Sequence, residues 1–213
     1  MRKILIVDDH TMVCEGIKRV IEDVEGVEVY ATVHSGEDAI RLLRKDPVDI
    51  VLMDVHMPGM GGLGATREIK RLFPNTKVIA LSAIDDAPYP AKMMEAGASG
   101  YVAKGSDMPE LLEAIDVVLK GEQYLSRVVA QKVALSRTTK NGSESPFDEL
   151  SDRELQVAQM IVDCVKTKEI ADKLNVSDKT VSTFRKRIFT KLGVGSDVEL
   201  ARLAMRYNVL GLV

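Results

Sequence analysis

Over residues 1–121, short apolar runs alternate with segments whose apolar residues recur at helical spacing. Continuous apolar runs are typical of parallel strands, because helices bury both faces of such a sheet. The predicted strands are Lys3–Val7, Val27–Val33, Ile50–Met53, Lys77–Leu81 and Gly100–Val102. The pattern therefore predicts an α/β fold, a doubly wound five-stranded parallel sheet with a helix after each strand.

The alternation ends after the helix predicted at Asp107–Lys120, which Gly121 terminates. A further short helix is predicted at Val128–Leu135. The polar stretch Ser136–Pro146 has no periodicity and is typical of a linker. We therefore expect three parts, at residues 1–121, 122–147 and 148–213.

The third part has only helical patterns. Ser151 with Glu154 three residues later forms a capping box that begins a helix, and Ser177 can cap another. The four expected helices run from Ser151 to about Val165, Lys168–Leu174, from Ser177 to about Leu192, and Asp197–Tyr207. Two helices joined by a tight turn predict a small all-α helix-turn-helix domain.

The third of these helices separates into two faces at about 100° per residue. Its apolar positions are Val181, Phe184, Ile188 and Leu192, and its polar positions are Lys179, Ser182, Thr183, Lys186 and Thr190. A helix that is merely solvated would show the same division. This helix would enter a major groove, and it has five Lys and Arg residues against one Asp. Its charge and its place in the motif therefore favour DNA recognition over a merely solvated surface.

Charge is distributed unevenly along the chain. Residues 1–121 have 14 Lys and Arg against 20 Asp and Glu, whereas residues 122–213 have 15 against 12. The overall charge of −3 therefore combines an acidic first part with a basic second part. This asymmetry favours a polyanionic partner for the second part.

Two predicted strand ends deliver three carboxylates. Asp8 and Asp9 follow one apolar run and Asp54 ends another. Ligands of parallel sheets gather beyond the carboxyl ends of the strands, so we expect these acids to converge. Three close carboxylates repel one another unless a divalent cation neutralises them, and hard oxygen ligands suit Mg²⁺. The alternative is that they only terminate strands or cap helices, Asp9 in particular.

Ser82 and Lys104 follow two further predicted strands. Together with the acids they offer a hydroxyl and an ammonium at the same sheet edge. This set can hold a metal ion beside a carboxylate that accepts a phosphoryl group.

Neither cysteine suggests a disulfide framework, because Cys14 and Cys164 lie far apart within predicted helices, as buried small side chains. The short apolar run after Met1-Arg2-Lys3 is far from a signal-peptide core, and no run approaches a membrane span. We expect a cytoplasmic protein without a membrane partner.

The first part resembles the receiver domain of two-component response regulators, through Asp8-Asp9, Asp54, Met57-Pro58-Gly59, Ser82, Tyr101 and Lys104 in order. The last part resembles the LuxR-type helix-turn-helix, through Leu150-Ser151-Asp152-Arg153-Glu154, Lys168-Glu169-Ile170-Ala171, Thr180-Val181 and Lys191-Leu192-Gly193-Val194. The arrangement resembles the NarL/FixJ class. Within it, the segments 57–63, 144–148 and 196–200 are similar to the GacA/UvrY/LetA group.

The receiver resemblance implies a role for each matching residue. Asp54 would accept a phosphoryl group from a sensor histidine kinase. Asp8, Asp9, Asp54 and the backbone carbonyl of His56 would hold Mg²⁺. Lys104 would pair with the phosphoryl oxygens, Ser82 would hydrogen-bond to them, and Tyr101 would move inward, although Tyr101 could instead simply fill the sheet edge. The protein would assist its own modification and would not be an enzyme.

The LuxR-type resemblance implies sequence-specific binding of double-stranded DNA by a homodimer that forms on phosphorylation. Ser182, Thr183 and Lys186 match groove-facing positions, and Lys179, Thr180 and Arg185 are expected at phosphates. The GacA-like group further implies small regulatory RNA genes as targets.

Two positions depart from the wider families. Gly105 follows Lys104 where receivers often have Pro, and Ser182-Thr183-Phe184 replaces a common Lys-x-His pattern. His10, His34 and His56 have no metal-ligand spacing, and none is predicted as a side-chain ligand.

Three other functions fit the sequence less well. A phosphohydrolase with a nucleophilic aspartate would need a second acid at position 56, where His56 stands. A flavin-binding domain would need a phosphate loop where Asp8-Asp9-His10 would repel phosphate. An RNA-binding platform would need aromatic side chains, of which the chain has few and no Trp.

Overall fold

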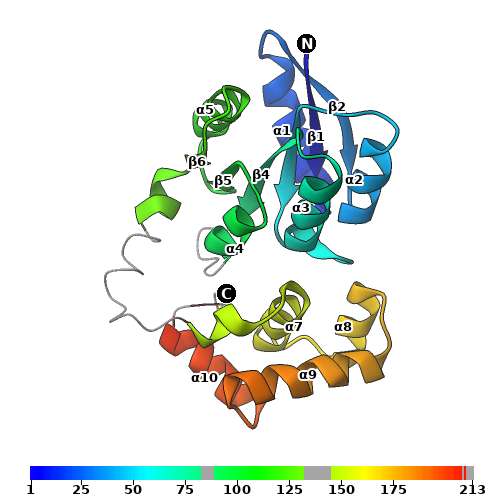
Figure 1. The fold of residues 1–213 in the computed structure, drawn as a ribbon, viewed down its shortest axis with the longest axis vertical. Helices are drawn as coiled ribbons and strands as arrows, with labels where there is room; N and C mark the ends of the chain where they lie inside the picture. Colours follow the sequence, from blue (N-terminus) through cyan, green and yellow to red (C-terminus); the bar gives the residue numbers. More distant parts are fainter. Residues whose placement is uncertain (83–88, 132–144, 208, 210–213) are drawn as a thin grey trace. The chain divides into compact units, whose positions relative to one another are not determined.

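The computed structural model describes residues 1–82, 89–131, 145–207 and 209. These residues form two compact units, one before residue 132 and one from residue 145 onward (Figure 1). No helix in the described ranges is long and apolar enough to cross a membrane.

The first unit is built on a parallel sheet with the strand order β2-β1-β3-β4-β5-β6. Its strands are β1 (Arg2–Val7), β2 (Val27–Val33), β3 (Ile50–Asp54), β4 (Lys77–Ser82), β5 (Gly100–Ala103) and β6 (Tyr124–Leu125). The chain passes from β1 outward to β2 and then back across β1 to β3. The predicted doubly wound parallel architecture is confirmed, with the reversal of strand order between β1 and β3.

The sheet has one strand more than the five predicted. In β6, Tyr124 pairs with Gly100 and Leu125 pairs with Tyr101 of β5. A strand of two residues is too short to show periodicity, so the hydrophobic pattern gave no sign of it.

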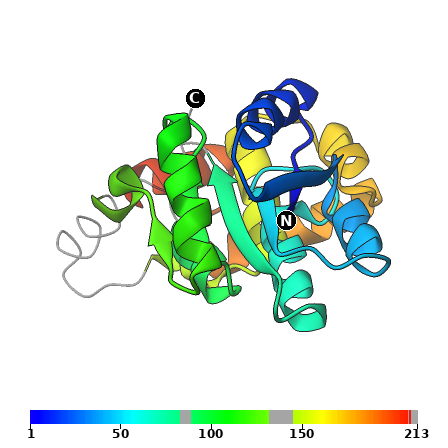
Figure 2. The same cartoon turned by 90° about the horizontal axis from the view of Figure 1, so that it is seen from above.

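Helices cover both faces of this sheet (Figure 2). One face carries α1 (Thr11–Glu22) and α5 (Met108–Leu119), and the other carries α2 (Gly36–Leu43) and α3 (Gly61–Leu72), with α4 (Tyr89–Glu95) beside α3. Alternate residues of each strand enter the two cores: Ile4 and Ile6 pack toward α1 and α5, Leu5 and Val7 toward α2 and α3. Both faces are therefore buried, as the continuous apolar runs require.

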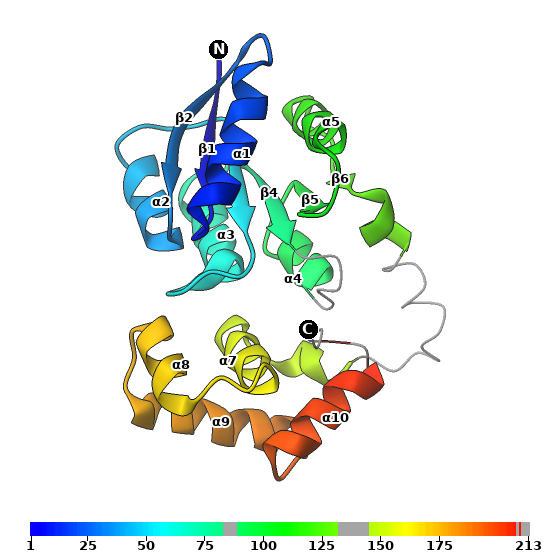
Figure 3. The ribbon, with the colours of Figure 1, turned by 180° about the vertical axis from the view of Figure 1, so that it is seen from behind.

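The second unit is helical (Figure 3). Its elements are the 3₁₀ helix η1 (Pro146–Glu149), α7 (Asp152–Val162), α8 (Thr167–Leu174), α9 (Asp178–Leu192) and α10 (Asp197–Tyr207). Ser151 and Glu154 form the expected capping box, and the Ser177 side chain accepts a hydrogen bond from Thr180 N at the start of α9. Asn175 adopts a left-handed conformation, φ 52°, which allows the tight turn between α8 and α9. The predicted helix-turn-helix is thereby confirmed.

Two predictions need adjustment. Helix α7 ends at Val162 rather than near Val165, because Cys164 has a positive φ of 58° that breaks the helix. Cys164 therefore lies in a turn and is exposed, whereas Cys14 is buried in α1 as expected. Residues 127–131 are helical, and the rest of the helix expected to Leu135 lies, like most of the expected linker, outside the described residues.

Candidate functional site

The carboxyl ends of four strands lie side by side at one edge of the sheet. The pairing register places Val7 beside Met53, Asp54 beside Leu81, and Ser82 beside Ala103. Backbone hydrogen bonding between β4 and β5 continues past the strand ends, since Lys104 N donates to Ser82 O at 2.6 Å. Asp8, Asp54, Ser82 and Lys104 are therefore adjacent.

The three acids converge as the strand ends predicted. Oxygens of Asp8, Asp9 and Asp54, with a ring nitrogen of His10, lie within 4.8 Å of one another. Asp8 and Asp54 are buried, while Asp9 is partly exposed. Helix α1 has His10 as its N-cap and no side-chain capping bond. The alternative that Asp9 serves as a helix cap therefore has no support in this geometry.

Lys104 joins the two buried acids. Its Nζ lies 2.8 Å from Asp8 Oδ2 and 2.9 Å from Asp54 Oδ2. Burial raises the pKa of Asp54 to about 6, although the Lys104 ammonium beside it works in the opposite direction. Burial alone would lower the pKa of Lys104, but the Asp54 and Asp8 carboxylates outweigh it and raise that pKa. One ammonium thus partly neutralises two buried carboxylates.

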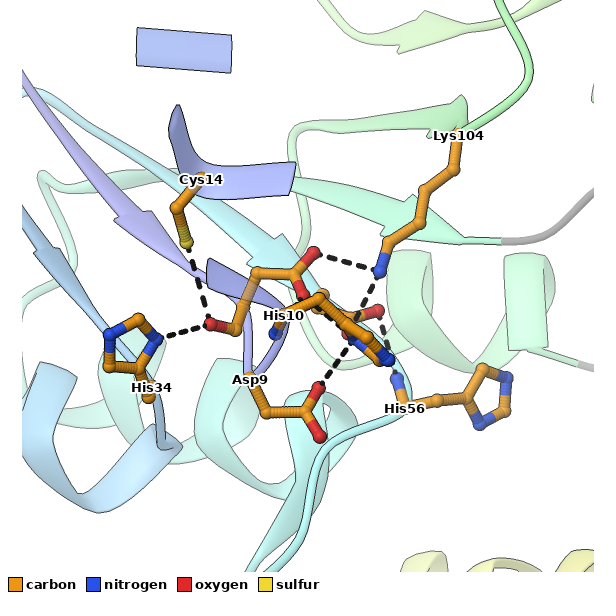
Figure 4. A network of polar contacts seen from close by, with 8 residues as sticks. Asp9, His10, Cys14, His34, His56 and Lys104 are labelled. Atoms are coloured by element: carbon orange, nitrogen blue, oxygen red, sulfur yellow. Dashed lines mark hydrogen bonds and ion pairs between the residues drawn. The ribbon is translucent and has the colours of Figure 1, made fainter. Parts of the chain in front are cut away.

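The main chain at Asp8 is held by two side chains (Figure 4). The carbonyl oxygen of Asp8 faces His34 Nδ1 at 2.8 Å, and it also accepts from the Cys14 thiol at 3.5 Å. Because a carbonyl only accepts, this bond requires the proton on Nδ1 of His34. Burial raises the pKa of the Cys14 thiol, which keeps it a donor. These contacts fix the end of β1 from which the Asp8 and Asp9 side chains project.

The loop after Asp54 is closely packed beneath the carboxylate. Gly62 N donates to Val55 O at 3.0 Å, and a Cβ at Gly62 would stand 2.0 Å from the Asp54 carbonyl oxygen. Glu37 of α2 accepts a hydrogen bond from Met60 N at 2.9 Å. The loop after Asp54 is therefore held to α2 through Glu37 and to the start of α3 through Gly62.

Three other predicted residues surround the acids. The Ser82 hydroxyl is buried and has no hydrogen-bond partner among the described residues. Tyr101 is fully buried in β5. His56 N donates to Asp54 Oδ1 at 3.2 Å, while the His56 ring packs edge-on against Tyr89.

The residues at this edge fit a magnesium ion. Carboxylate oxygens are the ligands that Mg²⁺ prefers. Three carboxylates face one ammonium, and among the described residues the buried Asp9 Oδ1 has no hydrogen-bond partner apart from its contact with His10 Nδ1 at 3.1 Å. The expected ligand set therefore has the charge and the donor type that this cation requires.

The predicted DNA-contacting residues all lie on α9. Val181, Ile188 and Leu192 are buried and Phe184 is partly buried, which agrees with the predicted apolar face. Lys179, Ser182, Thr183 and Lys186 are exposed, and Thr180 is partly exposed. The polar face thus remains on the surface of the second unit.

Arg185 differs from the other predicted contacts. Its guanidinium pairs with the Asp197 carboxylate of α10 and lies over the Phe189 ring, 5.5 Å from the centroid. An open groove of about 460 Å³ runs along this part of α9, lined by Ser182, Arg185, Lys186, Phe189, Thr190, Gly193 and Val194. Arg185 is therefore held by its own domain.

Sequence reasoning missed three contributors. It assigned no ligand role to His10, whose ring nitrogen lies within the acidic group. The only sequence signal was its position directly after Asp8-Asp9. The contacts of His34 with Asp8 and of Asp197 with Arg185 join separate elements, and spacing along the chain could not reveal them.

Comparison with known proteins agrees with both units. Residues 4–116 match the response regulator receiver domain, and residues 148–204 match the bacterial regulatory proteins of the luxR family. The chain belongs to the response regulator family. This response regulator therefore pairs a receiver with a LuxR-type DNA-binding domain, as a regulator of transcription.

Its curated relatives match over nearly their whole length. The response regulator is 47% identical to response regulator GacA of Pseudomonas aeruginosa, over 99% of this chain and 98% of that protein. It is 46% identical to response regulator UvrY of Escherichia coli K12, over 98% and 96%. The expected similarity to the GacA and UvrY group is confirmed.

Solved structures show the same architecture. RcsB from Salmonella enterica serovar Typhimurium, solved bound to promoter rprA in the presence of the phosphomimetic BeF₃⁻, aligns with a TM-score of 0.69 at 27% identity. The alignment covers 96% of this chain and 99% of RcsB. A LuxR-family response regulator from Aurantimonas sp. SI85-9A1 aligns over 64% of this chain at 40% identity, with a TM-score of 0.62.

Proposed function

We propose that Asp54 is the phosphorylation site of this response regulator and that its phosphorylation by a sensor histidine kinase controls DNA binding. The observation that supports this most is the setting of the carboxylate. Asp54 ends β3 next to Asp8, and Lys104 Nζ bridges the two acids at 2.8 and 2.9 Å. No second acid two residues later is present to protonate a leaving group, since that residue is His56.

In the proposed reaction an Asp54 oxygen attacks the phosphorus of the kinase's phosphohistidine. An O–P bond forms while the N–P bond breaks, and the imidazole leaves with the electron pair. Asp54 must be ionised to attack, and with a pKa of about 6 it is so at neutral pH. The regulator is itself modified and does not turn over a metabolite.

Asp8, Asp9, Asp54 and the His56 carbonyl would hold Mg²⁺. When bound, the cation neutralises charge on the transferred phosphoryl group. The Lys104 ammonium supplies a second positive charge next to the phosphoryl group. This ammonium already contacts Asp54 Oδ2, so a phosphoryl group added to Asp54 would lie within its reach.

Ser82 and Tyr101 are proposed to respond to phosphorylation of Asp54 and to transmit it to the surface of the receiver. The Ser82 hydroxyl can donate to a phosphoryl oxygen, because it lies at the end of β4 next to the Asp54 strand. Tyr101 on β5 is one strand further and fully buried. A new hydrogen bond at Ser82 would stabilise one arrangement of this region over another.

DNA recognition is proposed for the exposed face of α9. Ser182, Thr183 and Lys186 are placed at base edges, and Lys179, Thr180 and Arg185 at phosphates. To reach a phosphate, Arg185 would exchange its partner Asp197 for it. RcsB, which shares this architecture, has been solved as two dimers bound to two parallel DNAs. That structure supports a dimeric DNA-bound form for this regulator.

The test is replacement of the nucleophile. Asp54→Asn keeps the shape of the side chain and removes its nucleophilic oxygen, so it should abolish phosphoryl uptake from acetyl phosphate with Mg²⁺. Intact-mass spectrometry before and after treatment measures the adduct. Asp49→Asn, at an acid outside the site that pairs with Arg2, is the matched control and should be labelled like the parent protein. An undiminished adduct on Asp54→Asn would refute the assignment.

A further inference from the structure

The ring of His10 turns back onto the acids that precede it (Figure 4). His10 Nδ1 lies 3.2 Å from Asp8 Oδ1 and 3.1 Å from Asp9 Oδ1. The side chain is 66% exposed, so solvent is available to the ring on its other side. The imidazole is nevertheless placed between two carboxylate oxygens.

These oxygens are not the ones that Lys104 uses. The ammonium contacts Asp8 Oδ2 and Asp54 Oδ2, on the far side of the Asp8 carboxylate. Asp8 Oδ1 and Asp9 Oδ1 face the imidazole instead. A cation between them and His10 would therefore leave the Lys104 ion pairs in place.

The spacing of these three atoms matches a coordination shell. Neighbouring ligands of an octahedral ion stand about 3.0 Å apart when each lies about 2.1 Å from the metal. The two distances from His10 Nδ1, 3.2 and 3.1 Å, are close to this value. All four candidate ligand atoms lie within 4.8 Å, and opposite ligands of such an ion stand about 4.2 Å apart.

We propose that His10 Nδ1 is a direct ligand of the divalent cation in this site, alongside Asp8 and Asp9. The inference rests on the metal site proposed above, but it does not depend on phosphoryl transfer to Asp54. An imidazole donor suits first-row transition metals better than Mg²⁺, which prefers oxygen. The site thereby gains affinity for ions such as Ni²⁺ and Zn²⁺ relative to Mg²⁺, and His10 is the residue responsible.

The experiment uses Mn²⁺ as the probe and the full-length protein without any phosphoryl donor. Pulsed electron paramagnetic resonance of bound Mn²⁺ detects a directly coordinated ¹⁴N nucleus. The parent protein should show this coupling and His10→Gln should lose it, with Ni²⁺ affinity, measured in a separate titration, falling about tenfold or more. Mg²⁺ affinity, measured by competition, should change less than twofold.

Asp49→Asn is the control, because Asp49 lies outside the site and pairs with Arg2. It should retain the nitrogen coupling. If bound Mn²⁺ shows no nitrogen coupling in the parent, or an equal coupling in His10→Gln, His10 only hydrogen-bonds to the acids and the inference is wrong. Absence of any saturable Mn²⁺ or Mg²⁺ binding would overturn the metal site too, whereas failure of Asp54 labelling alone would leave this result intact.

Discussion

At the residue scale, the position of the Asp54 carboxylate depends on backbone packing as well as on its charged neighbours. The carboxylate lies at the end of β3, and the loop that follows returns so closely that Gly62 N bonds to Val55 O. Only a residue without a side chain fits there, because a Cβ at Gly62 would meet the Asp54 carbonyl oxygen at 2.0 Å. Gly62 therefore places the carboxylate indirectly, through the main chain.

Gly62→Ala should destabilise the first unit by about 1–3 kcal/mol, since backbone atoms must move to admit the methyl group. It should also slow labelling of Asp54 by acetyl phosphate. Gly64→Ala in the same helix is the control: its Cβ would meet nothing closer than Met60 Cβ at 3.7 Å. This change should be neutral or stabilise by up to about 1 kcal/mol through helix propensity. Urea unfolding followed by circular dichroism measures both variants, and equal midpoints would contradict the argument.

At the element scale, the cations of α9 have different functions. Lys191 pairs with the buried Glu154 of α7, and Arg185 pairs with Asp197 of α10. For Lys179, Lys186 and Arg187 the described part of the chain offers no ion pair. The paired residues hold the helix in its domain, whereas the unpaired ones remain available for a polyanion.

Lys186→Ala should weaken binding to a cognate DNA site by about 1–3 kcal/mol if the lysine contacts a base. It should thereby reduce the difference in affinity between the cognate site and random DNA. Lys179→Ala, at a proposed phosphate contact, should lower the affinity for cognate and random DNA about equally and make binding less dependent on salt. Fluorescence anisotropy titrations at two salt concentrations separate these cases. Both variants should stay folded, because both side chains are exposed. If Lys186→Ala binds both DNAs like the parent, α9 is not the reading element.

The stability gained from the ion pair between Glu154 of α7 and Lys191 of α9 should depend on pH. Although burial works in the opposite direction, the bonds from Lys191 and Ser151 lower the pKa of Glu154 overall. A lowered pKa means that this stabilisation is fully present above the ordinary value of 4.5 and is lost as pH falls from there through the lower pKa of the folded state. Hydrogen exchange in α7 and α9 should therefore be faster in Glu154→Gln than in the parent at pH 7, and the difference should shrink at pH 3.5. A difference that does not depend on pH would show that Glu154 acts through packing alone.

At the scale of the whole molecule, the proposed function requires that phosphorylation in the first unit alter DNA binding by the second. Residues 1–121 have a net charge of −6 and residues 122–213 have +3. The exposed Lys179, Lys186 and Arg187 of α9 lie in the second unit, so we assign affinity for DNA to that unit. A two-fold operator needs two recognition helices, about one helical turn of DNA apart. Dimer formation is therefore the simplest way for one carboxylate to control DNA affinity.

Acetyl phosphate with Mg²⁺ should shift the parent protein toward a dimer in sedimentation velocity experiments, because the phosphorylated form is proposed to self-associate. Asp54→Asn should not respond, and Asp49→Asn should respond like the parent. A shift of equal size in Asp54→Asn would mean that the reagent, and not phosphorylation of Asp54, drives association.

The sequence by itself determined the local elements and the chemistry at their ends. Runs such as Ile50–Met53 specify buried strands, Ser151 and Ser177 specify helix starts, and a parallel sheet must bring Asp8, Asp9 and Asp54 to one edge. These features depend on neighbours in the chain, so spacing and side-chain type are enough to predict them. The ends of helices were less predictable, since α7 stops where Cys164 takes a positive φ.

The tertiary structure decided which side chains meet across separate elements. It placed the His10 ring on the acids, His34 and Cys14 on the Asp8 carbonyl, and Asp197 on Arg185. It also added β6, a strand of two residues that exists only because β5 offers an edge to pair with. Such contacts depend on rotamers and packing between elements distant in the chain, and no periodicity of the sequence encodes them.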